Sequence, residues 1–205
     1  MNFVFNSEEI SALLLLSTAA SFTPGPNTTL STALAANRGM NSALQFILAV
    51  PVGWGILLAI CMAGVGNLVL AVPALRWLIV LSGTLYLLWM AQRLWLTREL
   101  NQVNTDRLNI TFMQGVAVQF LNIKAWMLAL SVVAGWVAGK PDTLARCLIL
   151  LPVMMGFGLV SNLTYALMGS LLREWLSKGI RLIAFNRGMS LALVLTAYWM
   201  FKSSF

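Results

Sequence analysis

The chain has 205 residues, of which 60% are hydrophobic and 9% are charged, and its formal net charge is +7. Soluble domains carry roughly 25% charged residues, so this composition excludes a soluble globular protein, and it equally excludes a disordered, collagen-like or disulfide-rich chain. The 13 basic residues are scattered between apolar segments, which argues against nucleic acid as a partner and indicates a protein embedded in the lipid bilayer.

Six apolar segments follow one another along the chain. A helix that crosses a bilayer needs about 20 apolar residues, and the loops left between these segments are too short to hold a soluble domain. The sequence therefore predicts an all-α, polytopic membrane protein with a single transmembrane domain over residues 1–205. The six predicted transmembrane helices are 10–36, 42–64, 74–95, 110–136, 147–171 and 183–202.

The first predicted helix resembles a signal peptide, because its apolar run reaches Ala19-Ala20-Ser21. A signal peptide begins with basic residues, however, and this segment is preceded by Glu8 and Glu9. We expect it to stay on the mature protein.

The same helix contains the motif Thr23-Pro24-Gly25-Pro26-Asn27 near its middle. Each proline lacks an N–H, so the carbonyl groups of Ala20 and Phe22 lose their helical donors. Such a break is tolerated in lipid where it is buried in protein or lines a wet cavity. Its two half-helices offer carbonyl groups and a positive N-terminus to the ammonium and carboxylate of a zwitterion, whereas a purely structural kink would satisfy these groups with neighbouring helices. The candidate substrate-binding residues here are Pro24, Gly25, Pro26 and Asn27, with Thr28 and Thr29 as helix caps or ligands.

A second polar motif, Gln119-Phe120-Leu121-Asn122-Ile123-Lys124, lies in the fourth predicted helix. An ammonium near the bilayer centre costs from about 2.5 to more than 10 kcal/mol, so Lys124 is a candidate functional residue. If the helix instead ended near Lys124, the side chain would reach the interface, but a helix over 110–136 places it too deep. Asn122 and Lys124 join the candidate substrate-binding residues. So does Asn162 in the fifth helix, whose amide either bonds across helices or faces a cavity.

Asn27 and Asn122 lie 95 residues apart, close to half of the chain. Two halves of three helices cross the membrane in opposite senses, so this spacing predicts two inverted repeats, about 1–100 and 101–205, with the binding site between them. Lys and Arg are enriched in cytoplasmic loops, and the first, third and fifth loops hold eight of them against four elsewhere outside the membrane. Both termini are therefore expected outside the cytoplasm. The eight residues are Arg38, Arg93, Arg98, Arg107, Arg173, Lys178, Arg181 and Arg187.

The sequence offers no set of residues that would bind a metal ion or a nucleotide. All six acidic residues lie in tails or loops, the chain has no histidine, and no P-loop occurs. The sequence predicts no cofactor and no metal, and it argues against an ATP-driven pump or a metal-dependent membrane enzyme. Gly135 and Gly139 fit the GxxxG pattern and are the feature that suggests a homodimer.

These features match one known pattern: T-P-G-P-N at 23–27, Q-F-L-N-I-K at 119–124, Gly83 with Tyr86 in the third helix, and Asn162 with Gly169 in the fifth. In them, and in its length and six predicted helices, the chain resembles the LysE/RhtB family of amino-acid exporters over nearly its whole length. Ile123 departs from the N-P-K of many members and is closer to the branch of cysteine and O-acetylserine exporters.

The resemblance implies a transporter and not an enzyme, one that exports small amino acids or their derivatives across the bacterial inner membrane by proton antiport. Because the predicted helices contain no carboxylate to pair with a second positive charge, neutral amino acids are favoured over a doubly cationic substrate such as lysine. Proton coupling needs a group that titrates within the membrane. Lys124 is the candidate, since it could give up its proton when the substrate ammonium arrives beside it. Its competing role is that of a fixed counter-ion for the substrate carboxylate.

Two other functions are compatible with six helices. A membrane thiol–disulfide electron carrier would use Cys61 and Cys147, which fall in the second and fifth helices. Their separation of 86 residues differs from the 95 of the asparagines, and neither has the electropositive setting of a reactive thiol, so both are expected to be buried and reduced. A membrane assembly factor or receptor without transport is the other alternative, and it predicts no substrate-dependent phenotype.

Overall fold

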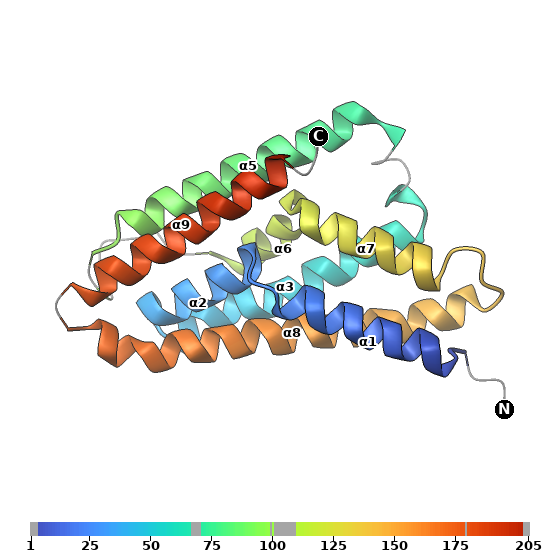
Figure 1. Cartoon of the computed structure of the whole chain (residues 1–205), viewed down its shortest axis with the longest axis horizontal. Helices are drawn as coiled ribbons and strands as arrows, with labels where there is room; N and C mark the ends of the chain where they lie inside the picture. The colour runs from blue at the N-terminus through green and yellow to red at the C-terminus, as the bar shows by residue number, and fades with distance from the viewer. Residues whose placement is uncertain (1–3, 67–70, 99, 101–109, 179, 203–205) are drawn as a thin grey trace.

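The structure, a computed structural model, describes residues 4–66, 71–98, 100, 110–178 and 180–202 (Figure 1). Within these ranges all regular secondary structure is helical, as the sequence predicts. Arg107, one of the basic loop residues, lies outside the described residues. The helices are α1 (Ser7–Phe22), α2 (Pro26–Arg38), α3 (Met40–Met62), α5 (Pro73–Trp95), α6 (Phe112–Leu121), α7 (Ile123–Trp136), α8 (Thr143–Leu176) and α9 (Arg181–Lys202).

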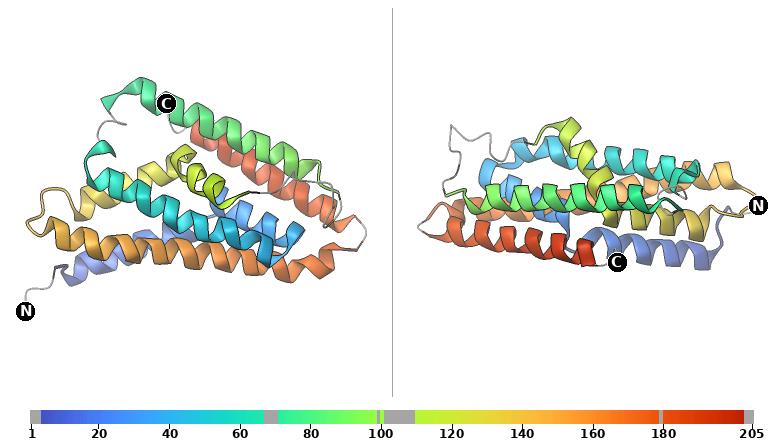
Figure 2. Two further views of the ribbon diagram at one scale, coloured as in Figure 1. Left: turned by 180° about the vertical axis from the view of Figure 1, so that it is seen from behind. Right: turned by 90° about the horizontal axis from the view of Figure 1, so that it is seen from above.

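The helices run back and forth along the long axis of the molecule (Figures 1 and 2). α1 and α2 follow one another along this axis on either side of a break, as do α6 and α7. The start of α1, the end of α7 and the start of α8 lie at one end, here called the α1 end. The last turn of α2, the end of α8 and the start of α9 lie at the opposite end, the α2 end. α2 packs along α8, α3 packs against α6 and α8, and α5 pairs with α9.

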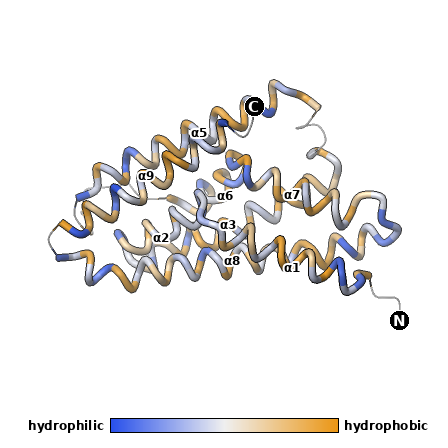
Figure 3. The backbone as a smooth tube through the Cα atoms, viewed as in Figure 1, coloured by the Kyte–Doolittle hydropathy of each residue, from blue (hydrophilic) through white to orange (hydrophobic). Residues whose placement is uncertain are grey.

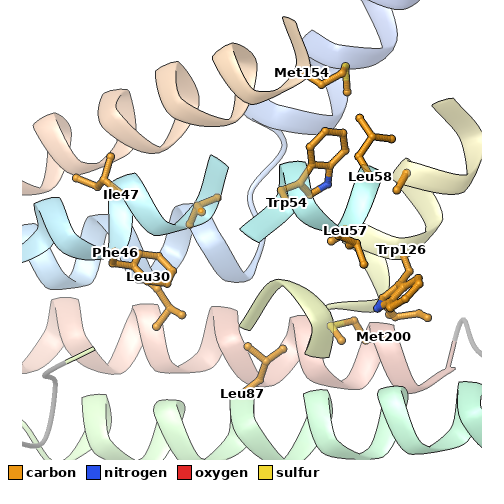
Figure 4. Close-up of a cluster of buried hydrophobic side chains, with 14 of the residues drawn as sticks. Leu30, Phe46, Ile47, Trp54, Leu57, Leu58, Leu87, Trp126, Met154 and Met200 are labelled. Carbon is orange, nitrogen blue, oxygen red and sulfur yellow. The ribbon is translucent and has the colours of Figure 1, made fainter. Parts of the chain in front are cut away.

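Most of the buried apolar side chains form one continuous core, which draws residues from both halves of the chain. Its central part, around Leu30, Phe46, Trp54, Leu57 and Met154, joins α2, α3 and α8 (Figure 4). The outer surface is also apolar. Leu81, Leu85 and Leu88 form an exposed stripe on α5, and Figure 3 shows hydrophobic residues along the length of most helices. In a bilayer, apolar side chains on the outer surface contact the lipid tails and need no burial within the protein.

Four helices are long and apolar enough to cross a membrane: α3, α5, α8 and α9. The bent pair α6 and α7 makes a fifth candidate span when it is counted as one unit. In chain order, α3, α5, the pair α6 and α7, α8 and α9 match the predicted second to sixth helices. The first predicted helix, 10–36, corresponds to α1 and α2, which have 16 and 13 residues and are each shorter than a span.

The expectation of one continuous helix over 110–136 is wrong. The chain bends by 69° between Phe112–Leu121 and Ile123–Trp136, at Asn122. The sequence shows no proline or glycine there, so the interruption has no local signal of the usual kind. Its cause is a side-chain cap and a tertiary contact, described with the site below.

Two glycines allow backbones to touch. A Cβ on Gly83 of α5 would overlap the carbonyl oxygen of Leu121, the last residue of α6. A Cβ on Gly169 of α8 would overlap the carbonyl oxygen of Thr32 in α2. Both positions therefore need a residue without a side chain, and Gly83 presses α5 directly against the break at Asn122.

The GxxxG pair does not form a helical face. α7 ends at Trp136, so Gly139 lies beyond the helix in a turn, where its φ of 71° suits glycine. Gly135 and Gly139 therefore do not share one helical face, and the homodimer stays a prediction.

A charged cluster ties α1 to the turn between α7 and α8 at the α1 end. Glu9 Oε1 accepts hydrogen bonds from Lys140 Nζ at 2.9 Å and from Arg146 Nη1 at 3.1 Å. Trp136 Nε1 donates to the backbone carbonyl of Glu9 at 2.9 Å. The hydrogen bonds from Arg146 and Lys140 favour the carboxylate and lower the pKa of Glu9 to about 2.

A buried amide pair joins α2 to α9 at the α2 end. Asn37 and Asn186 donate to each other's carbonyl oxygens at 2.7 and 2.8 Å, and Asn186 also donates to the backbone carbonyl of Thr97 at 3.0 Å. Arg173 Nη1 donates to the carbonyl of Ala36 at 3.3 Å, close to the last turn of α2. This end is therefore closed by hydrogen bonds between helices that are far apart in sequence.

Candidate substrate site

The first break spans residues 23–25, where the motif predicts it. Thr23 and Gly25 have extended backbones, because the residue before a proline disfavours the helical region. Pro26 opens α2 at the first helical position, where its missing N–H costs nothing. The hydroxyl of Thr28 accepts the Gly25 N–H at 2.9 Å and so caps the new helix.

One freed carbonyl has found a new donor. Pro26 cannot donate to the carbonyl of Phe22, and the Tyr165 hydroxyl of α8 does so instead at 2.8 Å. For the Phe22 carbonyl the alternative of a purely structural kink holds, because a neighbouring helix supplies its hydrogen bond. Tyr165 thereby fixes the end of α1 against α8.

The second break centres on Asn122, which is extended at φ −97° and ψ 99°. Its side-chain oxygen accepts the backbone N–H of Lys124 at 3.1 Å, which caps the start of α7. Trp126 Nε1 donates to the carbonyl of Phe120 at 2.9 Å and satisfies one of the acceptors that α6 leaves at its end. Lys124 consequently stands in the first turn of a helix and not in the middle of one.

The two breaks meet. Lys124 Nζ donates to the carbonyl oxygen of Thr23 at 3.4 Å, and a Cβ on Gly25 would lie 3.4 Å from the same nitrogen. Asn27 Nδ2 donates to Gln119 Oε1 at 2.8 Å, and Gln119 Nε2 donates back to Asn27 Oδ1 at 3.2 Å. Residues 101 and 92 positions apart in the chain are therefore in direct contact.

A pocket of about 600 Å³, including its open mouth, lies where α1, α2, α3, α7 and α8 converge. Six of the seven candidate site residues border it: Gly25, Pro26, Asn27, Asn122, Lys124 and Asn162. Pro24 is exposed and lies outside this lining, so its part is to shape the break.

Asn162 meets both expectations for its amide. Its oxygen accepts a hydrogen bond from the Ser31 hydroxyl of α2 at 2.8 Å, and its nitrogen donates to the carbonyl of Gly158 at 2.8 Å. It also borders the pocket. The residue therefore joins α2 to α8 directly beside the candidate site.

The pocket is electropositive at one side. Lys124 is its one charged lining residue in the described part of the chain, and the N-termini of α2 and α7, each with a partial positive charge, begin beside it. The last turn of α1 contributes Ala20, Ser21 and the neighbouring Thr23, at a helix end whose carbonyl groups lack intrahelical donors. The arrangement offers positive charge to a carboxylate and carbonyl oxygens to an ammonium.

Four neighbours of the site were not predicted as site residues. Gln119 belongs to the motif over 119–124 but was not itself a candidate, although it is fully buried against Asn27. Ser31 and Tyr165 are polar residues within apolar segments, which is the signal that could have found them. Trp54 borders the pocket and has no such signal, because an aromatic residue within an apolar helix is usually core.

The two cysteines do not form a redox pair in this structure. Cys61 is buried in α3 and Cys147 half-buried in α8, and both are free thiols. Neither is among the residues that line the pocket.

Comparison with known proteins agrees with the geometry. Residues 18–202 match the family model described as LysE type translocator. The chain is 24% identical over 166 residues to cysteine/O-acetylserine efflux proteins of Escherichia coli strain K12, Shigella flexneri serotype 5b strain 8401 and Shigella sonnei strain Ss046, which covers 80% of this chain and 84% of each relative. No solved structure gives a significant match. Because the family model covers nearly the whole chain, this protein belongs to the LysE family of translocators.

Proposed function

We propose that this protein exports small neutral amino acids or their derivatives, of the cysteine and O-acetylserine kind, from the cytoplasm across the bacterial inner membrane. The observation that carries the proposal is the contact between the Lys124 ammonium and the Thr23 carbonyl, where two broken helices meet beside one pocket. Relatives that are named for cysteine and O-acetylserine efflux support the substrate class.

Recognition of a zwitterion follows from the two sides of the break. The substrate carboxylate binds at the N-termini of α2 and α7, and the substrate ammonium replaces Lys124 at the carbonyl groups of the last turn of α1. A second positive charge on the substrate would find no carboxylate, because the described lining contains no Asp or Glu. Neutral side chains are therefore preferred.

Six spans in two inverted halves are the architecture we propose. α1 with α2 and α6 with α7 are the broken first helices of the two halves, and α3 with α8 and α5 with α9 are their equivalent pairs. Two observations support this: each equivalent pair packs together, as helices on a pseudo-two-fold axis do, and the two breaks lie side by side.

The α2 end is proposed to face the cytoplasm, which leaves both termini in the periplasm. Arg38 is the last residue of α2 and Arg173 lies in the last turn of α8, both at the α2 end, whereas Lys140 and Arg146 lie at the α1 end in the cluster with Glu9. Reporters that are active on one side of the membrane, fused to Phe205 and within the 97–107 segment, test this orientation. Cytoplasmic activity at Phe205 would reverse it.

The proposed energy source is proton antiport, and Lys124 is the residue that we propose binds and releases the proton. In the empty site the ammonium rests on the Thr23 carbonyl, and the arriving substrate ammonium competes for the same acceptors. Repulsion between the two positive charges then releases the proton from Lys124, so that substrate and proton exchange across the membrane.

Uptake into inverted membrane vesicles is the direct test of the function. Vesicles from cells that produce the protein should accumulate labelled O-acetylserine when their interior is acidic, and vesicles carrying Lys124→Met at equal abundance should not. Unlabelled serine, alanine and cysteine should compete, and lysine should not. Uptake that is equal in vesicles with and without the protein would refute the proposal.

A further inference from the structure

We propose that Trp54 determines which amino-acid side chains the pocket accepts, by closing its apolar wall and offering an unpartnered indole N–H to an acceptor on a short side chain. This rests on the proposed function and narrows its substrate class. The accepted side chains are those with a hydroxyl, thiol or ester oxygen one or two bonds from Cβ.

The pocket has a polar side and an apolar side. Thr23, Asn122 and Lys124 stand at the helix breaks, where the carboxylate and ammonium are proposed to bind. Apolar side chains form much of the remaining lining, beside the polar Ser161 and Asn162 of α8: Val50, Pro51 and Trp54 of α3, Leu128 of α7 and Met154 of α8. A substrate held at the breaks by its charged groups therefore extends its side chain toward this wall.

Trp54 faces the interior of the bundle. The lipid-facing stripe of α3 consists of exposed residues at helical spacing, among them Val52 and Ile56, two positions before and after Trp54 and so on the opposite side of the helix. Trp54 itself is 8% exposed, and the open space that it borders is the pocket. Figure 4 shows its ring beside Leu58, with Met154 above it, so the indole is held between α3 and α8. The Ser17 hydroxyl donates to the Met154 sulfur at 3.0 Å and fixes that neighbour.

The indole N–H of Trp54 differs from those of Trp126, which is buried, and Trp136, which is half-buried. Trp126 donates to the carbonyl of Phe120 and Trp136 to that of Glu9, both at 2.9 Å. Trp54 has no acceptor anywhere in the described ranges. Its nitrogen is not sealed in protein either, because the fully buried side-chain atoms without a partner in those ranges belong to Thr84 and Arg146. The donor is therefore reachable from the pocket.

A donor in this position discriminates between side chains of equal size. A site built to hydrogen-bond a substrate group binds the analogue without that group less well, because the buried donor is then left unpaired. Serine and alanine differ by one hydroxyl, so the ratio of their apparent affinities in competition measures the contribution of the indole N–H. The ring itself limits size, so branched and aromatic side chains are excluded by its bulk.

Two substitutions separate the effect of the indole N–H from the effect of the size of the ring. Trp54→Phe keeps an aromatic ring and removes the N–H, and Trp54→Ala removes both. The matched control is Trp199→Phe, because Trp199 lies on α9, is 56% exposed and faces away from the core. The measurement is inhibition of labelled O-acetylserine uptake by unlabelled serine, alanine, leucine and phenylalanine in inverted vesicles, at equal protein abundance.

For Trp54→Phe we expect the preference for serine over alanine to fall about 3- to 10-fold, the value of one hydrogen bond. For Trp54→Ala we expect leucine and phenylalanine to become competitors, and for Trp199→Phe no change. An unchanged ranking in both Trp54 variants, with uptake intact, overturns the inference and leaves the proposed function standing. Absence of any uptake by the wild-type protein overturns both. If Trp54→Ala does not accumulate in the membrane, the serine-to-alanine ratio of Trp54→Phe decides alone.

Discussion

The amide pair of Asn27 and Gln119 should couple the two halves of the protein energetically. Asn27 lies in the first turn of α2 beside the first break, and Gln119 lies in the last turn of α6 before the second break. Their side chains exchange two hydrogen bonds, of 2.8 and 3.2 Å, and Gln119 is fully buried. We expect Asn27→Ala and Gln119→Ala to be non-additive in the free energy of unfolding.

The magnitude follows from the geometry. Each single variant breaks two hydrogen bonds and leaves one amide unpaired, which costs about 1–3 kcal/mol. In the Asn27→Ala variant the loss is at the lower end, because Gln119 Nε2 keeps its bond to the Gly115 carbonyl at 3.2 Å. Side-chain hydrogen bonds between membrane helices contribute on average about 0.6 kcal/mol each, so two of them give a coupling energy of about 1 kcal/mol.

A double-mutant cycle measures this coupling. The free energy of unfolding is determined in lipid bicelles for the wild type, both single variants and the double variant. A control cycle pairs Asn27→Ala with Thr164→Ala, because Thr164 is exposed and bonds to Val160 within its own helix. The control should be additive within about 0.5 kcal/mol. If the Asn27 and Gln119 cycle is additive within the same limit, the proposed energetic coupling between the two halves is refuted.

Three further outcomes test the site and the α1 end. Pro24→Ala with Pro26→Ala should restore helical hydrogen bonding across 23–25, leave membrane abundance near normal and suppress export; normal export would make the break a structural kink. Lys124→Arg keeps a permanent charge, so it should still bind substrate in a competition assay but lose its response to an imposed pH gradient, and full gradient-driven export would exclude Lys124 as the coupling residue. The cluster of Glu9 with Arg146 depends on a carboxylate whose folded-state pKa is about 2, so its stabilising effect is complete above the unfolded value near 4.3 and is lost as the pH falls toward 2. The difference in melting temperature between wild type and Glu9→Gln should thus be constant from pH 7 to about 5 and shrink below 4; a difference that vanishes already at pH 6 would contradict it.

The first break could be predicted from sequence because its cause is covalent. Pro24 and Pro26 each remove a donor and restrict the residue before them, whatever surrounds them. The lengths of the apolar segments likewise predict α3, α5 and α9 to within two residues at each end, because the thickness of a bilayer sets the length of a helix that crosses it. α8 is longer than predicted, since it spans Thr143–Leu176 and not 147–171.

The second break could not be predicted in this way because its causes are tertiary. Asn122 caps α7, but an asparagine within an apolar segment is as often a helix interior residue that bonds to a neighbour. The decisive contacts come from elsewhere: Gly83 presses α5 against the end of α6, and Trp126 turns back to the Phe120 carbonyl. The prediction of one helix over 110–136 failed for this reason, and Lys124 lies in the first turn of α7, where its proposed role stays a prediction.

The uneven burial of α1 and α2 has a consequence for the speed of the transport cycle. Eleven of the thirteen residues of α2 are buried, against Leu13 and Ser17 alone in α1. At the α2 end Asn37 and Asn186 share two hydrogen bonds and are buried. To reach the opposite state, the protein must part a dry interface and expose two amides before new partners form. We therefore expect separation of that interface, and not diffusion of substrate into the pocket, to limit the turnover rate and to set its dependence on temperature.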